Sequence, residues 1–160
     1  MNATTLQAEA KRIQMVNQQI RPWNVFDRRV LTALRSVQRE EFVPADYRGL
    51  AFADTEIPLL RGQRMLRPAI EGRLLVALDS QPDEAVLLIG TGSGYLAAML
   101  AQLAASVTAI DKYPELTAAA TQKSEACAVR NVTLLTADYQ RFDPTQAFDR
   151  ILVSGSMPTL

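Results

Sequence analysis

The 160-residue sequence contains no histidine and a single cysteine, and these two shortages exclude several classes of enzyme. Without histidine there is no Ser–His–Asp triad, no Cys–His pair and no histidine metal site, so we expect no bound metal. One cysteine, Cys127, cannot form an internal disulfide. We expect it to lie in a helix spanning 114–129 as a small core or groove residue.

Charge and long apolar runs are also lacking. The 17 acidic and 17 basic residues give a formal net charge of zero, and no basic block occurs, so the long-range field gives no reason to expect a nucleic-acid partner. No apolar run reaches the length of a membrane span, and no signal-peptide pattern opens the chain. We therefore expect a soluble cytoplasmic protein without a membrane partner.

A glycine-rich turn in the middle of the chain is its most informative feature. An apolar stretch, 85–89, runs into this turn, and an apolar stretch of helical character follows. The turn reads Gly90, Thr91, Gly92, Ser93 and Gly94. This layout is typical of a buried parallel strand, a tight loop and a helix N-terminus, where backbone can approach a ligand closely and N–H groups can hold an anion. It predicts a site for a nucleoside-type cofactor, with an ordinary strand-to-helix turn as the alternative.

The spacing of the glycines distinguishes between cofactors. The dinucleotide fingerprint is G-x-G-x-x-G, and here Tyr95 occupies the place of the third glycine, which argues against a nicotinamide-dependent oxidoreductase. The sequence also lacks the G-x-x-x-x-G-K-[ST] of a P-loop. The compact G-x-G-x-G pattern resembles motif I of the S-adenosylmethionine-dependent methyltransferases. That resemblance implies that the loop passes under the methionine part of S-adenosylmethionine.

An acidic residue follows the next expected strand. The stretch 106–110 alternates and is β-branched, and it ends at Asp111, 21 residues beyond Gly90. A carboxylate at a strand end can accept hydrogen bonds from both ribose hydroxyls. The alternative for Asp111 is the N-cap of a helix whose first turn contains Pro114. We include the adjacent Lys112 in the expected cofactor-binding set.

A second acid follows a third expected strand, 131–136. Asp138 could accept a hydrogen bond from an adenine amino group while Tyr139 covers the ring, and ordinary turn chemistry is an equal alternative for Asp138. A fourth expected strand, 148–154, ends beside the glycine turn. From Ala85 the order is β-α-β-α-β-β, which indicates an α/β fold with parallel strands and right-handed crossovers.

The first 80 residues are expected to be mainly helical. Asp27 is the expected N-cap of a helix over 28–37, and Pro68 fits the first turn of a helix that runs to Leu78. An earlier helix ends at Arg21-Pro22, and its apolar face is expected to consist of Leu6, Ile13, Val16 and Ile20. We predict a single domain over 1–160, in which 1–80 form a helical and substrate-side part and 81–160 the cofactor-binding α/β part.

Over nearly all of its length, and not only at the glycine turn, the chain resembles the protein-L-isoaspartate O-methyltransferase family. The stretches that carry this resemblance are 15–20, 27–34, 39–44 (R-E-E-F-V-P), 47–54, 57–63, 88–100 and 131–132. It implies a Rossmann-like methyltransferase sheet with an N-terminal helical addition. It also implies an enzyme of protein repair, which transfers a methyl group from S-adenosylmethionine to the α-carboxylate of isoaspartyl residues in damaged proteins and releases S-adenosylhomocysteine. Such a transfer needs no histidine, because the sulfonium group is already activated and a carboxylate is ionised at pH 7.

The chain departs from the family pattern at three places. Leu66 stands where the family has a serine near the reacting carboxylate. Either Arg64 or Arg67 makes the contact to the carboxylate in its place, or the substrate differs. The alternative for both arginines is a solvated face. Leu88 replaces a common glutamate, and Tyr139 replaces a glycine. We interpret the chain as a divergent paralogue and leave the catalytic residue open. The alternative is a catalytically inactive paralogue that binds the cofactor or a partner.

The sequence stops shortly after the fourth expected strand, at Pro158-Thr159-Leu160. The family continues with further strands and helices, so we expect a sheet that is incomplete at its C-terminal side. The fourth strand would then be an edge with unpaired backbone groups and an uncovered apolar face. This predicts self-association through that strand, or low stability.

Overall fold

A computed structural model of the protein describes residues 3–155, so the chain end at Pro158-Thr159-Leu160 lies outside the described residues. The chain forms two compact units, Met1–Asp79 and Ser80–Leu160. Among residues 3–155, no helix is both long and apolar enough to cross a membrane.

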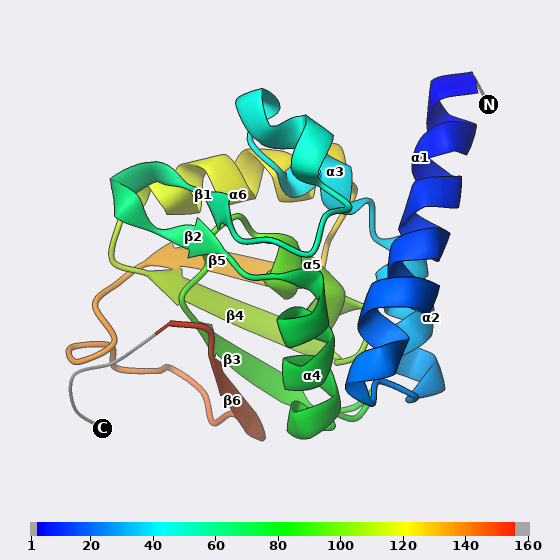
Figure 1. Ribbon diagram of the computed structural model, residues 1–160. Coiled ribbons are helices and arrows are strands. Elements are labelled where there is room, and N and C mark those ends of the chain that lie inside the picture. Colours follow the sequence, from blue (N-terminus) through cyan, green and yellow to red (C-terminus); the bar gives the residue numbers. More distant parts are fainter. Residues whose placement is uncertain (1–2, 156–160) are drawn as a thin grey trace. The chain divides into compact units, whose positions relative to one another are not determined.

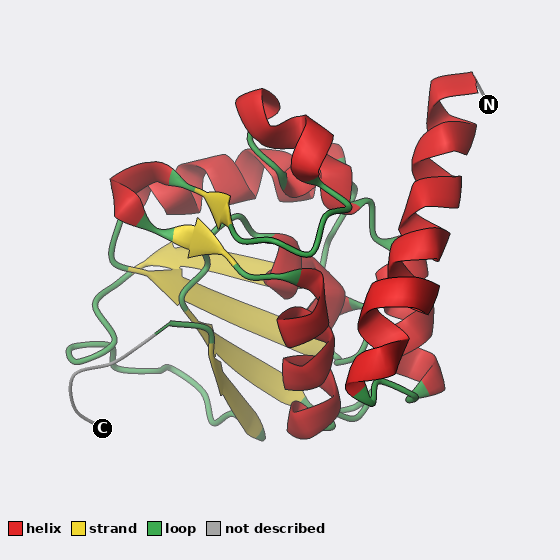
Figure 2. Cartoon of the chain, in the orientation of Figure 1, coloured by secondary structure: helices red, strands yellow, loops and turns green. Residues whose placement is uncertain are grey.

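The first unit is built mainly from short helices (Figures 1 and 2). They are α1 (Ala3–Met15), the π-helix η1 (Val16–Ile20), the 3-10 helix η2 (Arg21–Trp23), α2 (Arg28–Ser36), α3 (Arg39–Phe42), the 3-10 helices η3 (Ala45–Leu50) and η4 (Leu60–Gly62), and α4 (Pro68–Leu78). Strands β1 (Ile57–Pro58) and β2 (Arg64–Met65) pair antiparallel and form a small hairpin.

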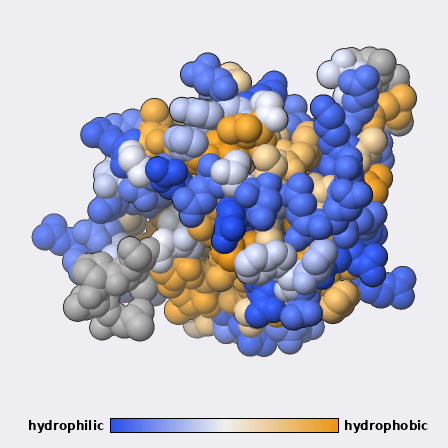
Figure 3. Space-filling view, in the orientation of Figure 1, coloured by the Kyte–Doolittle hydropathy of each residue, from blue (hydrophilic) through white to orange (hydrophobic). Residues whose placement is uncertain are grey.

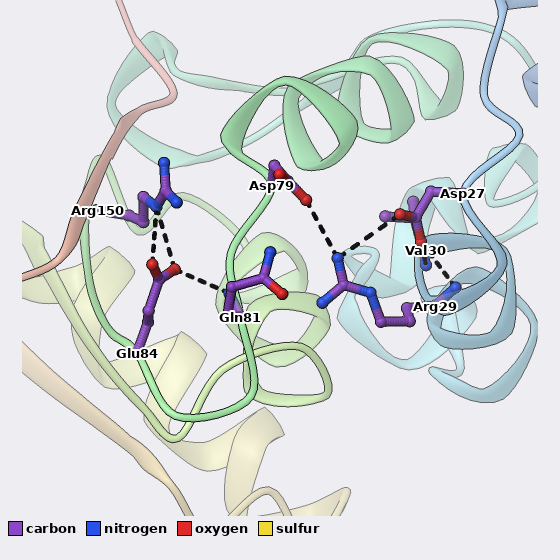
Figure 4. A network of polar contacts seen from close by, with 7 residues as sticks. All are labelled: Asp27, Arg29, Val30, Asp79, Gln81, Glu84 and Arg150. Carbon is purple, nitrogen blue, oxygen red and sulfur yellow. Dashed lines mark hydrogen bonds and ion pairs between the residues drawn. The ribbon is translucent and has the colours of Figure 1, made fainter.

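The expected helix starts in this unit are confirmed. Asp27 is the N-cap of α2, and its side chain accepts hydrogen bonds from the backbone N–H groups of Arg29 (2.8 Å) and Val30 (3.1 Å). These bonds, led by the one from Val30, lower the pKa of Asp27 because they stabilise its charged form. Arg29 also bonds Asp79 at 3.2 Å, as Figure 4 shows. Pro68 is the first residue of α4.

The expected apolar face of the first helix is partly wrong. Val16 and Ile20 are fully buried, but Leu6 is 50% exposed and Ile13 is 41% exposed. The chain changes from α-helix to π-helix after Met15, and the wider π turn alters which side chains face inward. Arg12 is buried instead, because its guanidinium bonds the Glu40 carboxylate.

The second unit is an α/β layer structure. Its elements are β3 (Ala85–Ile89), α5 (Tyr95–Ala101), β4 (Ser106–Asp111), α6 (Pro114–Ala126), β5 (Val132–Thr136) and β6 (Arg150–Val153). The four strands are all parallel and lie in the order β5-β4-β3-β6. This confirms the α/β class and the β-α-β-α-β-β order, and it places the carboxyl ends of the strands at one edge of the sheet.

The centre of this sheet is apolar. Leu88 in β3 is fully buried and stands opposite Ala109 of β4 and Leu152 of β6. A glutamate at this position would place a carboxylate in the sheet core, so leucine is the residue that this packing accommodates. The start of β6 is held by Arg150, whose Nε bonds both carboxylate oxygens of Glu84 (3.1 and 3.2 Å; Figure 4), and this bond lowers the pKa of Glu84.

The expected extent of the helix after Pro114 is wrong at its C-terminus. Helix α6 ends at Ala126, and Cys127 is its half-buried C-cap rather than a helical residue. Ala128 adopts a left-handed conformation (φ 56°), its N–H bonds the Glu125 carbonyl, and the N–H of Val129 bonds the Ser124 carbonyl. This is a Schellman termination, which stops the helix three residues before the predicted end.

Candidate active site

The glycine loop (residues 90–94) connects β3 to α5 at the carboxyl edge of the sheet. Gly90, Gly92 and Gly94 all have positive φ angles, of 96°, 53° and 86°. L residues with a Cβ rarely adopt this region, so the loop conformation itself favours glycine at three alternate positions. The loop is therefore shaped by its backbone, as the sequence predicted.

Two of these glycines also make room for the protein's own atoms. A Cβ at Gly90 would overlap Ser154 Oγ, which donates a hydrogen bond to the Gly90 carbonyl at 2.7 Å. A Cβ at Gly94 would lie 2.9 Å from the Cβ of Ala120 on α6. The sequence predicted that a ligand lies close to the backbone at these glycines. At Gly90 and Gly94, the segment after β6 and helix α6 lie there instead.

Asp111 lies at the end of β4 and faces the glycine loop. The residue is only 9% exposed, and its carboxylate accepts hydrogen bonds from the backbone N–H groups of Gly92 (3.2 Å) and Tyr113 (3.1 Å). The alternative as a helix cap is wrong, because Tyr113 is the N-cap residue of α6 and Pro114 its first residue. A carboxylate has about four acceptor sites. Two therefore remain for a ligand such as a ribose diol.

The hydroxyls of the glycine loop differ in their partners. Ser93 Oγ accepts from the Tyr95 N–H at 3.2 Å and so satisfies the start of the short helix α5. Thr91 Oγ1 is buried and has no hydrogen-bond partner among the described residues. A buried hydroxyl without a partner is costly unless a bound group satisfies it. Thr91 of the loop and Asp111 of β4 therefore offer a donor and a carboxylate, a set that fits a nucleoside ligand with an amino-acid end.

The other predicted cofactor residues lie at the same edge of the sheet. Asp138 follows β5, is exposed, and accepts from the Gln140 N–H at 3.1 Å, which is the turn chemistry given as its alternative. Tyr139 is half-buried, and its hydroxyl accepts from Gln140 Nε2 at 3.3 Å. Lys112 is exposed, with Nζ 4.9 Å from the centroid of the Tyr113 ring. The adjacent strand ends bring these residues to the edge that holds Asp111.

In the first unit, residues 64–67 include Leu66, which aligns with the family's serine near the reacting carboxylate, and we refer to these four residues as the acceptor segment. Arg64 is largely exposed, with Nε 3.9 Å from Glu56. Leu66 is half-buried, and its carbonyl accepts from Arg39 Nη2 at 2.8 Å. The Arg67 guanidinium lies over the Trp23 ring, 5.8 Å from its centroid.

The R-E pair of the R-E-E-F-V-P stretch forms two separate buried ion pairs. Arg39 is fully buried and bonds Glu71 on α4, while Glu40 bonds Arg12 on α1. Burial raises the pKa of Glu71 to about 7, against the pull of Arg39. The family resemblance includes this stretch, but no role for its residues follows from the sequence. An adjacent Arg and Glu before a Phe-Val-Pro run was the available signal.

The chain was compared with known proteins. The sequence model of the family described as protein-L-isoaspartate(D-aspartate) O-methyltransferase matches residues 10–160. A protein-L-isoaspartate O-methyltransferase of Koribacter versatilis is 40% identical over 148 residues, covering 92% of this chain and 67% of the relative. That of Dinoroseobacter shibae is 41% identical over 138 residues (86% and 64%), and that of Aeropyrum pernix 40% over 152 residues (92% and 58%). The chain thus spans about three fifths to two thirds of these relatives.

Solved structures share the fold. A Plasmodium falciparum protein of the isoaspartate methyltransferase type, in complex with S-adenosyl-L-homocysteine, superposes with a TM-score of 0.77 at 16% identity, covering 96% of this chain and 75% of that one. A second protein-L-isoaspartate O-methyltransferase gives a TM-score of 0.72 at 20% identity, covering 91% and 47%. These likenesses confirm the methyltransferase type of α/β sheet.

Proposed function

Because this chain belongs to the protein-L-isoaspartate(D-aspartate) O-methyltransferase family, we propose that it methylates a carboxylate of isoaspartyl residues in damaged proteins with S-adenosylmethionine. When bound, S-adenosylmethionine supplies a methyl group on a sulfonium centre. An oxygen of the substrate carboxylate would take this methyl group as the carbon–sulfur bond breaks, and S-adenosylhomocysteine would be the product. The protein aligns the two groups and excludes water, which requires no histidine.

The observation that carries the cofactor assignment is the Asp111 carboxylate. It is buried, faces the glycine loop through the Gly92 N–H, and keeps two acceptor sites for the ribose hydroxyls. Thr91 supports the same assignment, since its buried hydroxyl has no partner among the described residues and can donate to the carboxylate of the methionine end.

The remaining members of the proposed cofactor site take lesser parts. The backbone of Gly90, Ser93 and Gly94 shapes the loop, and the exposed Lys112 flanks the ribose. Asp138 and Tyr139 stand at the end of β5, where they are suited to the adenine amino group and ring. All of them lie at one sheet edge, which supports this part of the proposal.

On the acceptor side, we assign the contact to the substrate carboxylate to Arg64 or Arg67. Leu66 has no hydroxyl that could donate to a carboxylate, and the guanidinium groups of Arg64 and Arg67 beside it are charged donors. Arg64 is the more exposed of the two, and its Nε lies 3.9 Å from Glu56. Arg64→Gln and Arg67→Gln should each be tested for a raised KM for the peptide, at unchanged affinity for S-adenosylhomocysteine.

The proposed function is tested by calorimetry with S-adenosylhomocysteine and by methylation of an isoaspartyl peptide. Heat on binding and turnover of the peptide, with no turnover of the aspartyl control peptide, are the expected results. Absence of heat and of any thermal shift at millimolar ligand would remove the cofactor assignment. Binding without turnover would leave the inactive paralogue, and Leu66→Ser would then show whether a hydroxyl alone restores activity.

The proposal extends to the kind of substrate, the cellular compartment and the oligomeric state. We propose that the partner is a protein or peptide that carries the carboxylate, and that the chain acts in the cytoplasm, since a single cysteine cannot form an internal disulfide. We also propose self-association through β6. This strand ends the described sheet, Ile151 is 58% exposed, and Figure 3 shows apolar side chains gathered over this strand. Sedimentation of the 160-residue chain and of Ile151→Lys tests this, with the variant expected to be the smaller species.

A further inference from the structure

Arg39 connects three separate segments of the first unit. Its Nε donates to the Ala51 carbonyl at 3.0 Å, its Nη2 to the Leu66 carbonyl at 2.8 Å, and its Nη1 to the Glu71 carboxylate. The guanidinium is fully buried, and the Glu71 side chain is almost so. A planar fork with five N–H donors on three nitrogens can reach three separated acceptors at once, whereas the donors of a lysine all lie on one nitrogen.

The position of these bonds relates them to the acceptor segment. Leu66 lies within that segment, and Arg67 follows directly as the N-cap residue of α4. The Arg67 carbonyl accepts from the N–H of Glu71 at 3.1 Å, so the residue that anchors Arg39 belongs to the same helical turn. Arg39 thus holds the acceptor segment from inside the protein, and Glu71 holds Arg39.

We propose that Arg39 is a positioning residue, oriented by Glu71, whose bond to the Leu66 carbonyl fixes the acceptor segment for the methyl acceptor. This proposal rests on the proposed function for its meaning in catalysis. Arg39 is not proposed to touch the cofactor or the methyl acceptor. It acts through its bond to the Leu66 backbone, which in turn orients the side chains of Arg64 and Arg67.

The first unit provides its own control. Arg12 and Glu40 form a second buried ion pair, and Arg12 also donates to the Arg35 carbonyl at 3.1 Å. Among the described residues, the hydrogen bonds and ion pairs of this pair join it to Arg35 and not to residues 64–67. Glu71→Gln and Glu40→Gln therefore each replace the carboxyl group of a buried Arg–Glu pair by an uncharged amide, but only the first alters the group that anchors Arg39 and, through it, Leu66.

The experiment compares these two variants, with Arg39→Lys as a second route, in the full chain. For Glu71→Gln and Arg39→Lys we expect kcat/KM for an isoaspartyl peptide to fall by about tenfold or more, because small displacements of a reacting group are costly. Their Kd for S-adenosylhomocysteine should stay within about twofold of the wild-type value. Glu40→Gln should keep its peptide kcat/KM within about threefold. Equal losses in Glu71→Gln and Glu40→Gln would overturn the proposal.

A second readout does not depend on activity. Trp23 is the single tryptophan, and Arg67 lies over its ring. The Trp23 emission spectrum should therefore change in Glu71→Gln and Arg39→Lys but not in Glu40→Gln. If the wild-type chain fails to methylate the peptide, the proposed function fails, and this spectrum decides the positioning role alone. Unchanged emission in both Arg39→Lys and Glu71→Gln would then refute it.

Discussion

Replacement of Asp111 by alanine is the most direct test of the cofactor site. The carboxylate is buried at the end of β4 and holds the glycine loop through the Gly92 N–H. Its two remaining acceptor sites are the ones assigned to the ribose hydroxyls. Asp111→Ala should therefore remove two charge-assisted hydrogen bonds from the bound nucleoside.

The expected loss is worked from these bonds. Removing a ribose contact of this kind should cost about 1–3 kcal/mol in binding, since part of the loss is offset by water that enters the site. This corresponds to a Kd for S-adenosylhomocysteine that is about 5- to 150-fold weaker. The Gly92 and Tyr113 N–H groups also lose their acceptor, so the variant should unfold at a lower temperature than the wild-type chain.

Calorimetry at a temperature well below both melting points separates these two effects. Asp111→Asn keeps one acceptor oxygen and should bind with an intermediate affinity. Asp83→Ala is the matched control, because Asp83 is an exposed acid in the same unit. A folded Asp111→Ala variant that binds S-adenosylhomocysteine as tightly as Asp83→Ala would refute the assignment and leave Asp111 with only its loop-bonding role.

Three further predictions concern stability. Gly90→Ala should lower the free energy of unfolding in urea by about 1–3 kcal/mol, because a Cβ is strained at φ 96° and overlaps Ser154 Oγ. The additional change Ser154→Ala should relieve only the overlap. Full recovery of the free energy of unfolding would show that the φ angle is not strained. Leu88→Glu should destabilise by at least about 3 kcal/mol, since it puts a carboxylate in the sheet core, whereas Leu88→Met should cost less than about 1.5 kcal/mol; equal unfolding midpoints would contradict this. Burial raises the pKa of Glu71 from 4.5 to about 7, so the folded state binds the proton of this carboxyl group more tightly than the unfolded state does. The stabilisation of the fold by this proton is complete below pH 4.5 and is lost as the pH rises to about 7. Wild-type stability should then fall by up to about 3 kcal/mol between pH 5 and pH 8 relative to Glu71→Gln, and parallel pH profiles of the two proteins would refute this.

Much of the fold follows from local sequence signals. Asp27 and Pro68 have the side-chain oxygen and the fixed φ that begin helices, and both helices start where expected. The four parallel strands of the second unit were found because apolar and β-branched runs alternate with helical stretches, whereas the hairpin of β1 and β2 was not predicted. The first helix was less predictable, since a switch to π geometry after Met15 leaves no simple period in the sequence.

The end of α6 shows a similar limit. The predicted end lay three residues too far because Ala128, which adopts the left-handed conformation after the helix, has a high intrinsic helix propensity. The turn is stabilised by bonds to carbonyls already fixed within the helix. Local propensity was overridden there by the geometry of termination.

The sequence by itself determined the family, the parallel α/β order and the identity of the glycine loop, because these depend on residues close together along the chain. Only the tertiary structure decided that Ser154 and Ala120 occupy the space beside Gly90 and Gly94, and that the Asp111 carboxylate bonds the loop. Only the structure paired Arg39 with Glu71, 32 residues away. A buried charge takes whichever partner the packing brings within reach, and no local period in the sequence specifies that choice.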